Sequence, residues 1–246
     1  MTFLYSPKRF AVHLDPSSLL YVIPDGVLPC HTGVADGISE GRLIEWCLEV
    51  VMPEGKAFVD VGANVGTWAL RFAASPKVVK VLAFEPLVEV AACLEKAALL
   101  NGLRPRLSVE RVALGAPEQG GSTMELTVTQ PDSEGSTLRP EFLVRHTHDP
   151  TRHPATTASV KVMTLDSYRM TNVGLMKLDV EGAELAVLQG AVETLRHSGY
   201  PKLIVETWGA QWYQEQREEV FAFLQQLGYK IVPLMGYSNE VLAEHA

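Results

Sequence analysis

Residues 57–66, AFVDVGANVG, limit the possible folds of this chain more than any other segment. An apolar run ends in the carboxylate Asp60 and continues into two glycines, Gly62 and Gly66, and the next residues, TWALRFAA, favour a helix. A strand, a glycine turn and a helix begin a βαβ unit. The glycines would let the backbone turn sharply and approach a ligand, where the helix offers unpaired N–H groups. The segment therefore predicts a nucleotide-type pocket.

The glycine spacing indicates which nucleotide-like ligand fits this pocket. A dinucleotide-binding fold requires G-x-G-x-x-G, whereas Gly62 and Gly66 are separated by three residues. Asp60 also lies where a diphosphate would approach, and a carboxylate repels phosphate but pairs with an ammonium group. The pattern favours a cofactor with a cationic amino-acid tail and no phosphate, such as S-adenosylmethionine.

A second strand is predicted at 78–86, VVKVLAFEP, and it ends in Glu85. A carboxylate roughly 20 residues beyond a glycine loop is placed to accept hydrogen bonds from two ribose hydroxyls. This placement would serve an NAD enzyme equally well, so it indicates an adenosine ligand without choosing between cofactors. Pro86 is predicted to begin a helix that ends at Asn101-Gly102.

Two later strands, predicted at 174–179 and 202–206, also end in carboxylates. The carboxyl ends of parallel strands meet at one edge of a sheet, and α/β folds bind ligands at that edge. We therefore expect a single site that contains the four carboxylates at the strand ends: Asp60, Glu85, Asp179 and Glu206.

Six blocks of the sequence, between about Val51 and Glu206, carry a family resemblance. They are DVGANVG (60–66), AFEP (83–86), LLNGL (99–103), TLDSY (164–168), MKLDVEGAELAVLQGA (176–191) and PKLIVE (201–206). In order and spacing they resemble FkbM-type S-adenosylmethionine-dependent methyltransferases. The resemblance implies a doubly wound, Rossmann-like α/β sheet of the class I methyltransferase type. It also implies the cofactor contacts Asp60, Gly62, Ala63, Asn64, Gly66, Glu85, Pro86 and Asp179.

Asn64 stands where many methyltransferases have glycine, but it matches the FkbM pattern. Asparagine tolerates the left-handed backbone conformation that such a turn can require.

The acceptor chemistry is less constrained by the sequence. Methyl transfer to a hydroxyl needs in-line placement of the reactants and a group that removes the hydroxyl proton. The candidate catalytic residues are Asp179, Glu206 and Glu184, although Glu181 or Glu184 would also suit a helix-capping role. A loop histidine, or a divalent cation held by Asp179 and Glu206, is an alternative, and no metal is predicted.

Lys177 allows a comparison with ribose 2′-O-methyltransferases, which use a lysine and carboxylate set. Lys177 and Asp179 share a face only if their strand is regular, because side chains alternate along a strand. Three aromatic residues soon after Glu206 are predicted either to form an acceptor wall or to pack under the sheet: Trp208, Trp212 and Tyr213.

Residues 115–159 interrupt the α/β pattern. The segment is rich in Pro, Gly, Ser and Thr and has one clear strand, at 124–130. Long irregular segments inside a compact domain are usually functional, so we expect a substrate-facing insertion. Its three histidines, which have no strong metal-ligand spacing, are predicted to be solvated: His146, His148 and His153.

The other predicted elements frame this core. They are an N-terminal β-hairpin within residues 1–36, a helix over 38–52, a third strand at 107–115, a returning strand at 159–164, a helix over 211–228 and a closing antiparallel hairpin. They indicate one domain, 1–246, divided into an N-terminal hairpin and helix (1–50), a cofactor-binding half (51–115), an insertion (116–159) and a C-terminal half (160–246).

Composition excludes several classes of protein. A formal net charge of −8 argues against the broad basic surface of nucleic-acid-binding proteins. The sequence has no run of about 18 apolar residues and no signal-peptide pattern, which predicts a cytoplasmic protein without membrane contact. Three widely spaced cysteines, Cys30, Cys47 and Cys93, predict neither disulfides nor a zinc site.

These observations predict a methyltransferase that acts on a hydroxyl of a small molecule, such as a sugar or a natural-product scaffold. Three alternatives stay open: an RNA ribose 2′-O-methyltransferase, an NAD-dependent oxidoreductase and a non-catalytic S-adenosylmethionine-binding module. The sequence does not indicate the oligomeric state.

Overall fold

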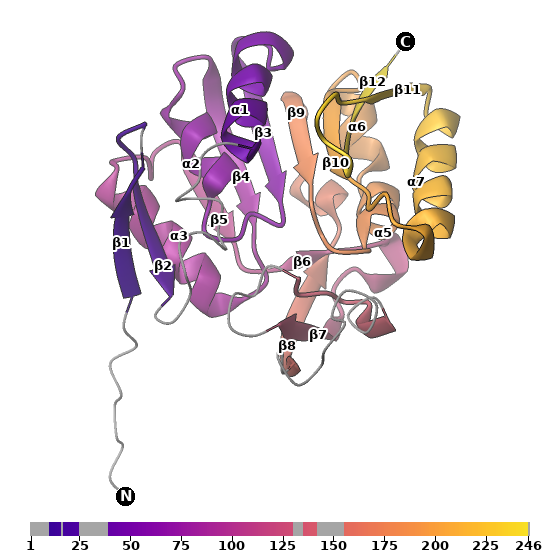
Figure 1. Cartoon of the computed structure of the whole chain (residues 1–246), viewed down its shortest axis with the longest axis horizontal. Helices are drawn as coiled ribbons and strands as arrows, with labels where there is room; N and C mark the ends of the chain where they lie inside the picture. Colours follow the sequence, from indigo (N-terminus) through magenta and orange to yellow (C-terminus); the bar gives the residue numbers. More distant parts are fainter. Residues whose placement is uncertain (1–9, 16, 25–38, 130–134, 142–154, 246) are drawn as a thin grey trace, which may run out of the picture.

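The computed structural model describes residues 10–15, 17–24, 39–129, 135–141 and 155–245. A seven-stranded sheet in the order β11-β12-β10-β9-β3-β4-β5 forms its centre (Figure 1). The strands are β3 (Lys56–Val61), β4 (Val78–Phe84), β5 (Leu107–Glu110), β9 (Val173–Leu178), β10 (Lys202–Glu206), β11 (Tyr229–Pro233) and β12 (Glu240–His245). Only β12, among the described strands of this sheet, runs antiparallel to the other six. The predicted doubly wound α/β class is confirmed.

Helices cover both faces of the sheet (Figure 1). On one face lie α1 (Ser39–Trp46), which continues into a π-helical turn (Cys47–Val51), α2 (Thr67–Ala74) and α3 (Val88–Leu100). On the other face lie α5 (Glu184–Gln189), α6 (Val192–His197) and α7 (Gln214–Gln226). Each face therefore has its own hydrophobic core, as a strand buried on both sides requires.

The two central strands are buried along nearly their whole length. Every residue of β9 is buried, and in β3 only Lys56 is partly exposed. Apolar side chains fill both faces, as is usual in parallel sheets. The exceptions are Asp60 on β3 and Lys177 on β9, which are paired in register. Two ionisable groups thus lie side by side in the interior, close to the carboxyl edge.

The predicted N-terminal hairpin is present as β1 (Phe10–Leu14) and β2 (Leu20–Pro24), which pair antiparallel. The buried residues of β2 join the core beside α3. Asp15 holds the turn, because its carboxylate accepts hydrogen bonds from the Ser17 hydroxyl and the Leu19 N–H. Its other partner is Arg71 of α2, with Nη2 3.1 Å from Oδ2.

The insertion contains more regular structure than its composition suggests. A three-stranded sheet consists of β6 (Ala113–Leu114), β8 (Ala155–Met163) and β7 (Thr123–Thr129), with a 3₁₀ turn at Pro117–Gln119. The prediction of one strand over 107–115 was wrong: β5 ends at Glu110, and Ala113–Leu114 form the separate strand β6, which pairs with β8. Figure 1 shows this small sheet at the bottom, on the side where β3 and β9 end.

The C-terminal part follows the predictions with small differences. The helix expected over 211–228 is a 3₁₀ turn (Gln211–Tyr213) followed by α7. β11 and β12 form the expected antiparallel hairpin, and β12 lies between β11 and β10. Cys47 and Cys93 are buried free thiols, whereas Cys30 lies outside the described residues. Within the described part of the chain, no helix has the length and apolar character needed to cross a membrane.

Candidate functional site

The turn between β3 and α2 is fixed by the end of β4. The N–H groups of Gly62 and Ala63 both donate to the carbonyl oxygen of Phe84, at 3.1 and 2.9 Å. Asn64 has a φ of 48°, so it adopts the left-handed backbone conformation that asparagine was expected to tolerate here. The predicted cofactor loop is therefore anchored before any ligand binds.

The two glycines of this turn are required by contacts within the chain itself. A Cβ atom on Gly62 would lie 1.8 Å from the carbonyl oxygen of Asp179, and one on Gly66 would lie 2.2 Å from the Leu94 side chain. Both residues also have positive φ angles, 84° and 94°. Gly62 thus lets the β3 turn lie directly against the residue that follows β9. The predicted approach of these glycines to a ligand stays a prediction.

Glu85, directly after β4, is buried and held by the backbone. Its two carboxylate oxygens accept hydrogen bonds from the N–H of Asn64, at 3.0 Å, and of Leu87, at 2.9 Å. Burial raises the pKa of Glu85 to about 7, although both hydrogen bonds act to lower it. The helix expected to begin at Pro86 begins at Val88. The carboxylate therefore has a fixed position beside the glycine turn.

Asp60 is the most deeply buried carboxylate of the predicted site, with 1% of its surface exposed. No side chain of the described residues donates a hydrogen bond to its oxygens, although the backbone N–H of Ala69 lies close enough to lower the pKa of Asp60. Burial raises its pKa to about 7, and the nearby charge of Lys177 acts in the opposite direction. A buried polar group without a partner is costly and uncommon in a folded protein. A further group that donates a hydrogen bond to Asp60 would therefore stabilise its ionised form.

Lys177 lies beside Asp60 in the sheet and contacts groups from two further segments. Its Nζ donates to Oδ2 of Asp179 at 2.8 Å and lies 3.7 Å from Oε1 of Glu40 on α1. It also lies 5.3 Å from the ring centroid of Trp68 on α2. Lys177 and Asp179 thus share a face, which the sequence comparison left open. Glu40 carried no sequence signal, because it belongs to no motif and lies far from Lys177 along the chain.

Asp179 and Glu206 lie together with Glu181, and Asp179 joins this group to Lys177. One carboxylate atom from each of the three lies within 4.8 Å of the others. Burial alone would raise the pKa of Asp179, but Lys177 and a hydrogen bond with Glu206 bring it below its ordinary value. Burial and the charge of Asp179 raise the pKa of Glu206 well above its ordinary range. Of these two carboxyl groups, Asp179 is therefore the one that ionises more readily.

Oxygen ligands at this spacing suit a divalent cation. Acidic groups are often close together without one, and we assign no metal to these three residues.

Glu184, the third predicted catalytic residue, is occupied by contacts with the chain. Oε1 accepts hydrogen bonds from the N–H of Val180 and of Gly182, at 3.3 and 3.1 Å. Oε2 accepts one from the hydroxyl of Tyr213. Oε1 thus holds the turn after β9, and Oε2 joins Glu184 to the 3₁₀ turn before α7. This arrangement favours a positioning role, and a catalytic role for Glu184 stays a prediction.

The insertion contacts the site through Thr137, which sequence reasoning missed. The Thr137 hydroxyl donates to the carbonyl oxygen of Glu181 at 2.6 Å, and its backbone pairs with Thr127 of β7. Trp208 forms a hydrogen bond with the Glu181 side chain, and its ring lies 6.0 Å from that of Trp212. The described part of the insertion therefore borders the carboxylate group. The three predicted loop histidines, His146, His148 and His153, lie outside the described residues.

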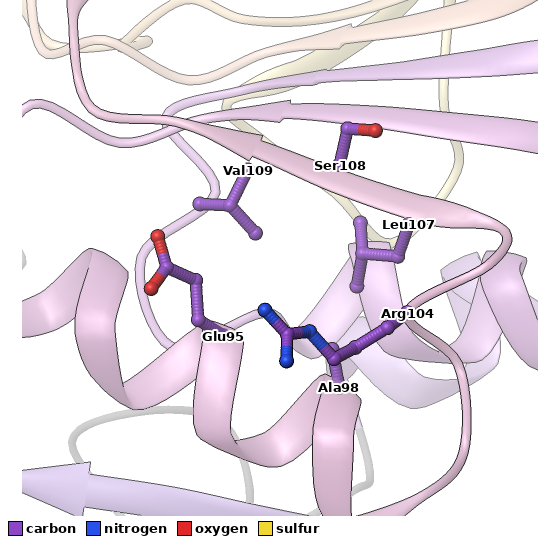
Figure 2. Close-up of a pocket in the computed structure, with 6 residues that line it drawn as sticks. All are labelled: Glu95, Ala98, Arg104, Leu107, Ser108 and Val109. Atoms are coloured by element: carbon purple, nitrogen blue, oxygen red, sulfur yellow. The ribbon is translucent and has the colours of Figure 1, made fainter.

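A shallow depression of about 270 Å³ occurs elsewhere, between α3 and the edge strand β5. Figure 2 shows Glu95 and Arg104 beside it, with Leu107 and Val109 of β5. None of the predicted site residues lines it, so it adds nothing to the site at the strand ends.

Comparisons with known proteins agree with this geometry. Residues 60–231 match the family described as the methyltransferase FkbM domain. Methyltransferase sdnD of Sordaria araneosa is 29% identical over 211 residues, which cover 75% of this chain and 78% of that protein.

Two solved structures illustrate the likeness in fold. An O-methyltransferase of Thermotoga maritima, described as S-adenosylmethionine-dependent, matches with a TM-score of 0.50 and 14% identity, over 92% of this chain and 74% of that one. The methyltransferase FkbM of Methylobacillus flagellatus KT matches with a TM-score of 0.49 and 16% identity, over 77% of this chain. The match spans only 43% of that solved chain. Because the family match extends from Asp60 through the glycine turn and the carboxylates at the ends of β9 and β10, this chain belongs to the FkbM methyltransferase family.

Proposed function

We propose that this protein transfers a methyl group from S-adenosylmethionine to a hydroxyl group of a small molecule, such as a sugar or a natural-product scaffold. The observation that supports the cofactor best is Asp60, a buried carboxylate that accepts no hydrogen bond from a side chain of the described structure. An ammonium group would supply that partner and would favour the ionised carboxylate. S-adenosylmethionine provides such a group, together with a methyl group bonded to a positively charged sulfur.

Glu85 would bind the ribose of the same cofactor. Its carboxylate already accepts one backbone hydrogen bond at each oxygen, and each oxygen has a second lone pair for a hydroxyl donor. These hydrogen bonds fix the carboxylate beside the turn that contains Asn64. The absence of a dinucleotide glycine pattern also favours a cofactor without phosphates.

Asp179 is the proposed proton acceptor for the hydroxyl. Lys177 favours the ionised form of Asp179, whereas burial and the charge of Asp179 favour the protonated form of Glu206. Asp179 would take the hydroxyl proton as the oxygen gains the methyl group, while the methyl–sulfur bond of the cofactor would break and leave neutral S-adenosylhomocysteine. Trp208 and Trp212, both partly exposed, together with the insertion held by Thr137, would border the acceptor.

Isothermal titration with S-adenosylhomocysteine, with NADH in parallel, tests the cofactor assignment. We expect binding of S-adenosylhomocysteine alone. D60N and E85Q should each weaken it by about 1–3 kcal/mol, the usual contribution of a buried hydrogen bond to a charged group. E54Q changes an exposed carboxylate and serves as the control, with unchanged binding expected. Normal binding by both site variants would refute the assignment, and binding of NADH alone would refute the proposed function.

A ribose hydroxyl of RNA is the second candidate acceptor. The specific observation in its favour is the Lys177–Asp179 pair next to Glu206, which resembles the lysine and carboxylate set of ribose methyltransferases. The net charge of −8 argues against it. RNA binding that weakens steeply with salt would support this candidate, and its absence would exclude it. A non-catalytic module would bind S-adenosylhomocysteine but methylate no acceptor in a hydroxyl library.

A further inference from the structure

One buried lysine lies between the two halves of the proposed site. Lys177 is 7% exposed, and its charge acts on carboxylates from three segments of the chain. Asp60 on β3 belongs to the cofactor half, Asp179 after β9 belongs to the acceptor half, and Glu40 comes from α1. The ammonium group of Lys177 therefore interacts with both the proposed cofactor half and the proposed acceptor half of the site.

The geometry leaves this ammonium group with capacity for more than one carboxylate. Lysine has three N–H donors, and among the described residues Lys177 makes a hydrogen bond to Asp179 only. Glu40 lies slightly farther away, at 3.7 Å. Trp68 packs near the ammonium group, and burial keeps water away, so these charges interact more strongly than they would at the surface.

We propose that Lys177 is a positioning residue that couples the two halves of the site: it holds Asp179 toward the acceptor and keeps Asp60 available to the cofactor. The proposal rests on the assignment of Asp60 to the cofactor pocket under the proposed function. Because both carboxylates depend on one positive charge, a change at either one alters the other.

The groups around Asp60 determine the sign of this coupling. Burial raises the pKa of Asp60 to about 7, Lys177 lowers it, and the charges of Asp179 and Glu40 raise it. Asp60 and Glu85 also repel each other. Removal of the Asp179 charge takes away a repulsion and leaves Lys177 to Asp60 and Glu40. Asp60 should then ionise at a lower pH.

The decisive variant is therefore D179N. Binding of S-adenosylhomocysteine is measured by calorimetry from about pH 5.5 to 8.5. Ionisation of Asp60 is followed in the ligand-free protein by ¹³C NMR, with the aspartate carboxyl carbons labelled. The Asp60 signal is assigned by its loss in D60N. We expect the pH midpoint of S-adenosylhomocysteine binding and the pH midpoint of Asp60 ionisation both to fall by about one pH unit in D179N. D179N should then bind S-adenosylhomocysteine several-fold more tightly than the wild type at pH 6.

Other variants separate this coupling from a general loss of structure. E40Q removes a second repulsive charge, so its midpoints should move in the same direction by a smaller amount. The exposed control E54Q should not change them. K177M should raise the midpoint of Asp60, and K177R should restore it toward the wild-type value. Where K177M does not fold, K177Q, which also removes the charge but keeps a polar side chain, takes its place.

An unchanged or raised Asp60 midpoint in D179N would overturn the proposal, as would weaker binding of S-adenosylhomocysteine at every pH. If the wild type binds no S-adenosylhomocysteine, the proposed function fails. The NMR titration then still decides whether Lys177 couples the two carboxylates.

Discussion

At the scale of single residues, Gly62 has the most demanding position in the site. Its φ of 84° and the Asp179 carbonyl oxygen, 1.8 Å from where a Cβ would lie, both exclude a side chain. G62A should therefore cost more than about 3 kcal/mol of unfolding free energy, because backbone strain and a clash with rigid main chain add together. Chemical denaturation measures the loss.

Gly121 provides the matched control for this substitution. Its φ is 83°, but a Cβ atom added there would meet no other atom within 4 Å. G121A should cost only about 1–2 kcal/mol, the penalty of a left-handed conformation alone. Equal losses in G62A and G121A would show that the contact with Asp179 is unimportant.

Glu184 is predicted to stabilise the turn after β9. E184A would leave the N–H of Gly182 and the hydroxyl of Tyr213 without their buried acceptor. We expect a loss of about 2–4 kcal/mol in urea unfolding. E184Q keeps one acceptor oxygen and should recover a large part of this loss. Wild-type stability in E184A would contradict the positioning role.

The sequence predicted these site residues unequally, for a physical reason. Asp60, Glu85 and Asp179 could be found because each ends an apolar run, and parallel strands end at a common edge. Glu40 and Thr137 could not, because their contacts with Lys177 and Glu181 join segments far apart along the chain. Only the folded chain brings such pairs together.

At the scale of elements, the sequence predicted the bounds of strands that contain strong apolar runs. It did not predict the bounds of strands whose residues are ordered mainly by pairing with a neighbouring strand. β10 has the predicted bounds, 202–206. β8 begins at Ala155, earlier than predicted, because its first residues, ATTA, are weakly apolar and are ordered by antiparallel pairing with β7. Strand preference depends on such neighbours more than on the residues themselves.

The N-terminal hairpin should depend on one ion pair. Arg71 and Asp15 are both largely buried, with side chains 10% and 1% exposed. R71M would leave the Asp15 carboxylate buried without its cation, which we expect to cost about 3–5 kcal/mol. In R71M, amide hydrogen exchange should show that β2 opens faster than β9.

An exposed pair serves as the control. Nη2 of Arg111 lies 2.6 Å from Oε2 of Glu95, but both side chains remain accessible to water. R111M should therefore cost less than about 1 kcal/mol of unfolding free energy. Similar losses in R71M and R111M would refute the special role of the buried pair.

At the scale of the whole molecule, the buried carboxylates should make the ligand-free protein less stable as the pH rises. Burial raises the pKa of Asp60 and of Glu85 to about 7, whereas unfolded carboxyl groups titrate near about 4. Between these values the folded state retains protons that the unfolded state has released. Its stability therefore falls from about pH 4.5 to about pH 7 and then levels off.

Binding of the cofactor should offset this loss, since the ionised forms of Asp60 and Glu85 are those that would pair with an ammonium group and with hydroxyl donors. The stabilisation by saturating S-adenosylhomocysteine in urea unfolding should thus increase between about pH 5 and pH 8. The double variant D60N/E85Q should flatten both profiles, because neither side chain then titrates. Two outcomes would contradict this prediction: a stability of the ligand-free protein that rises from pH 5 to pH 7, or a stabilisation by S-adenosylhomocysteine that does not depend on pH. Either outcome would show that these carboxylates are already ionised in the folded chain. Their burial would then not prepare the site for a cationic cofactor.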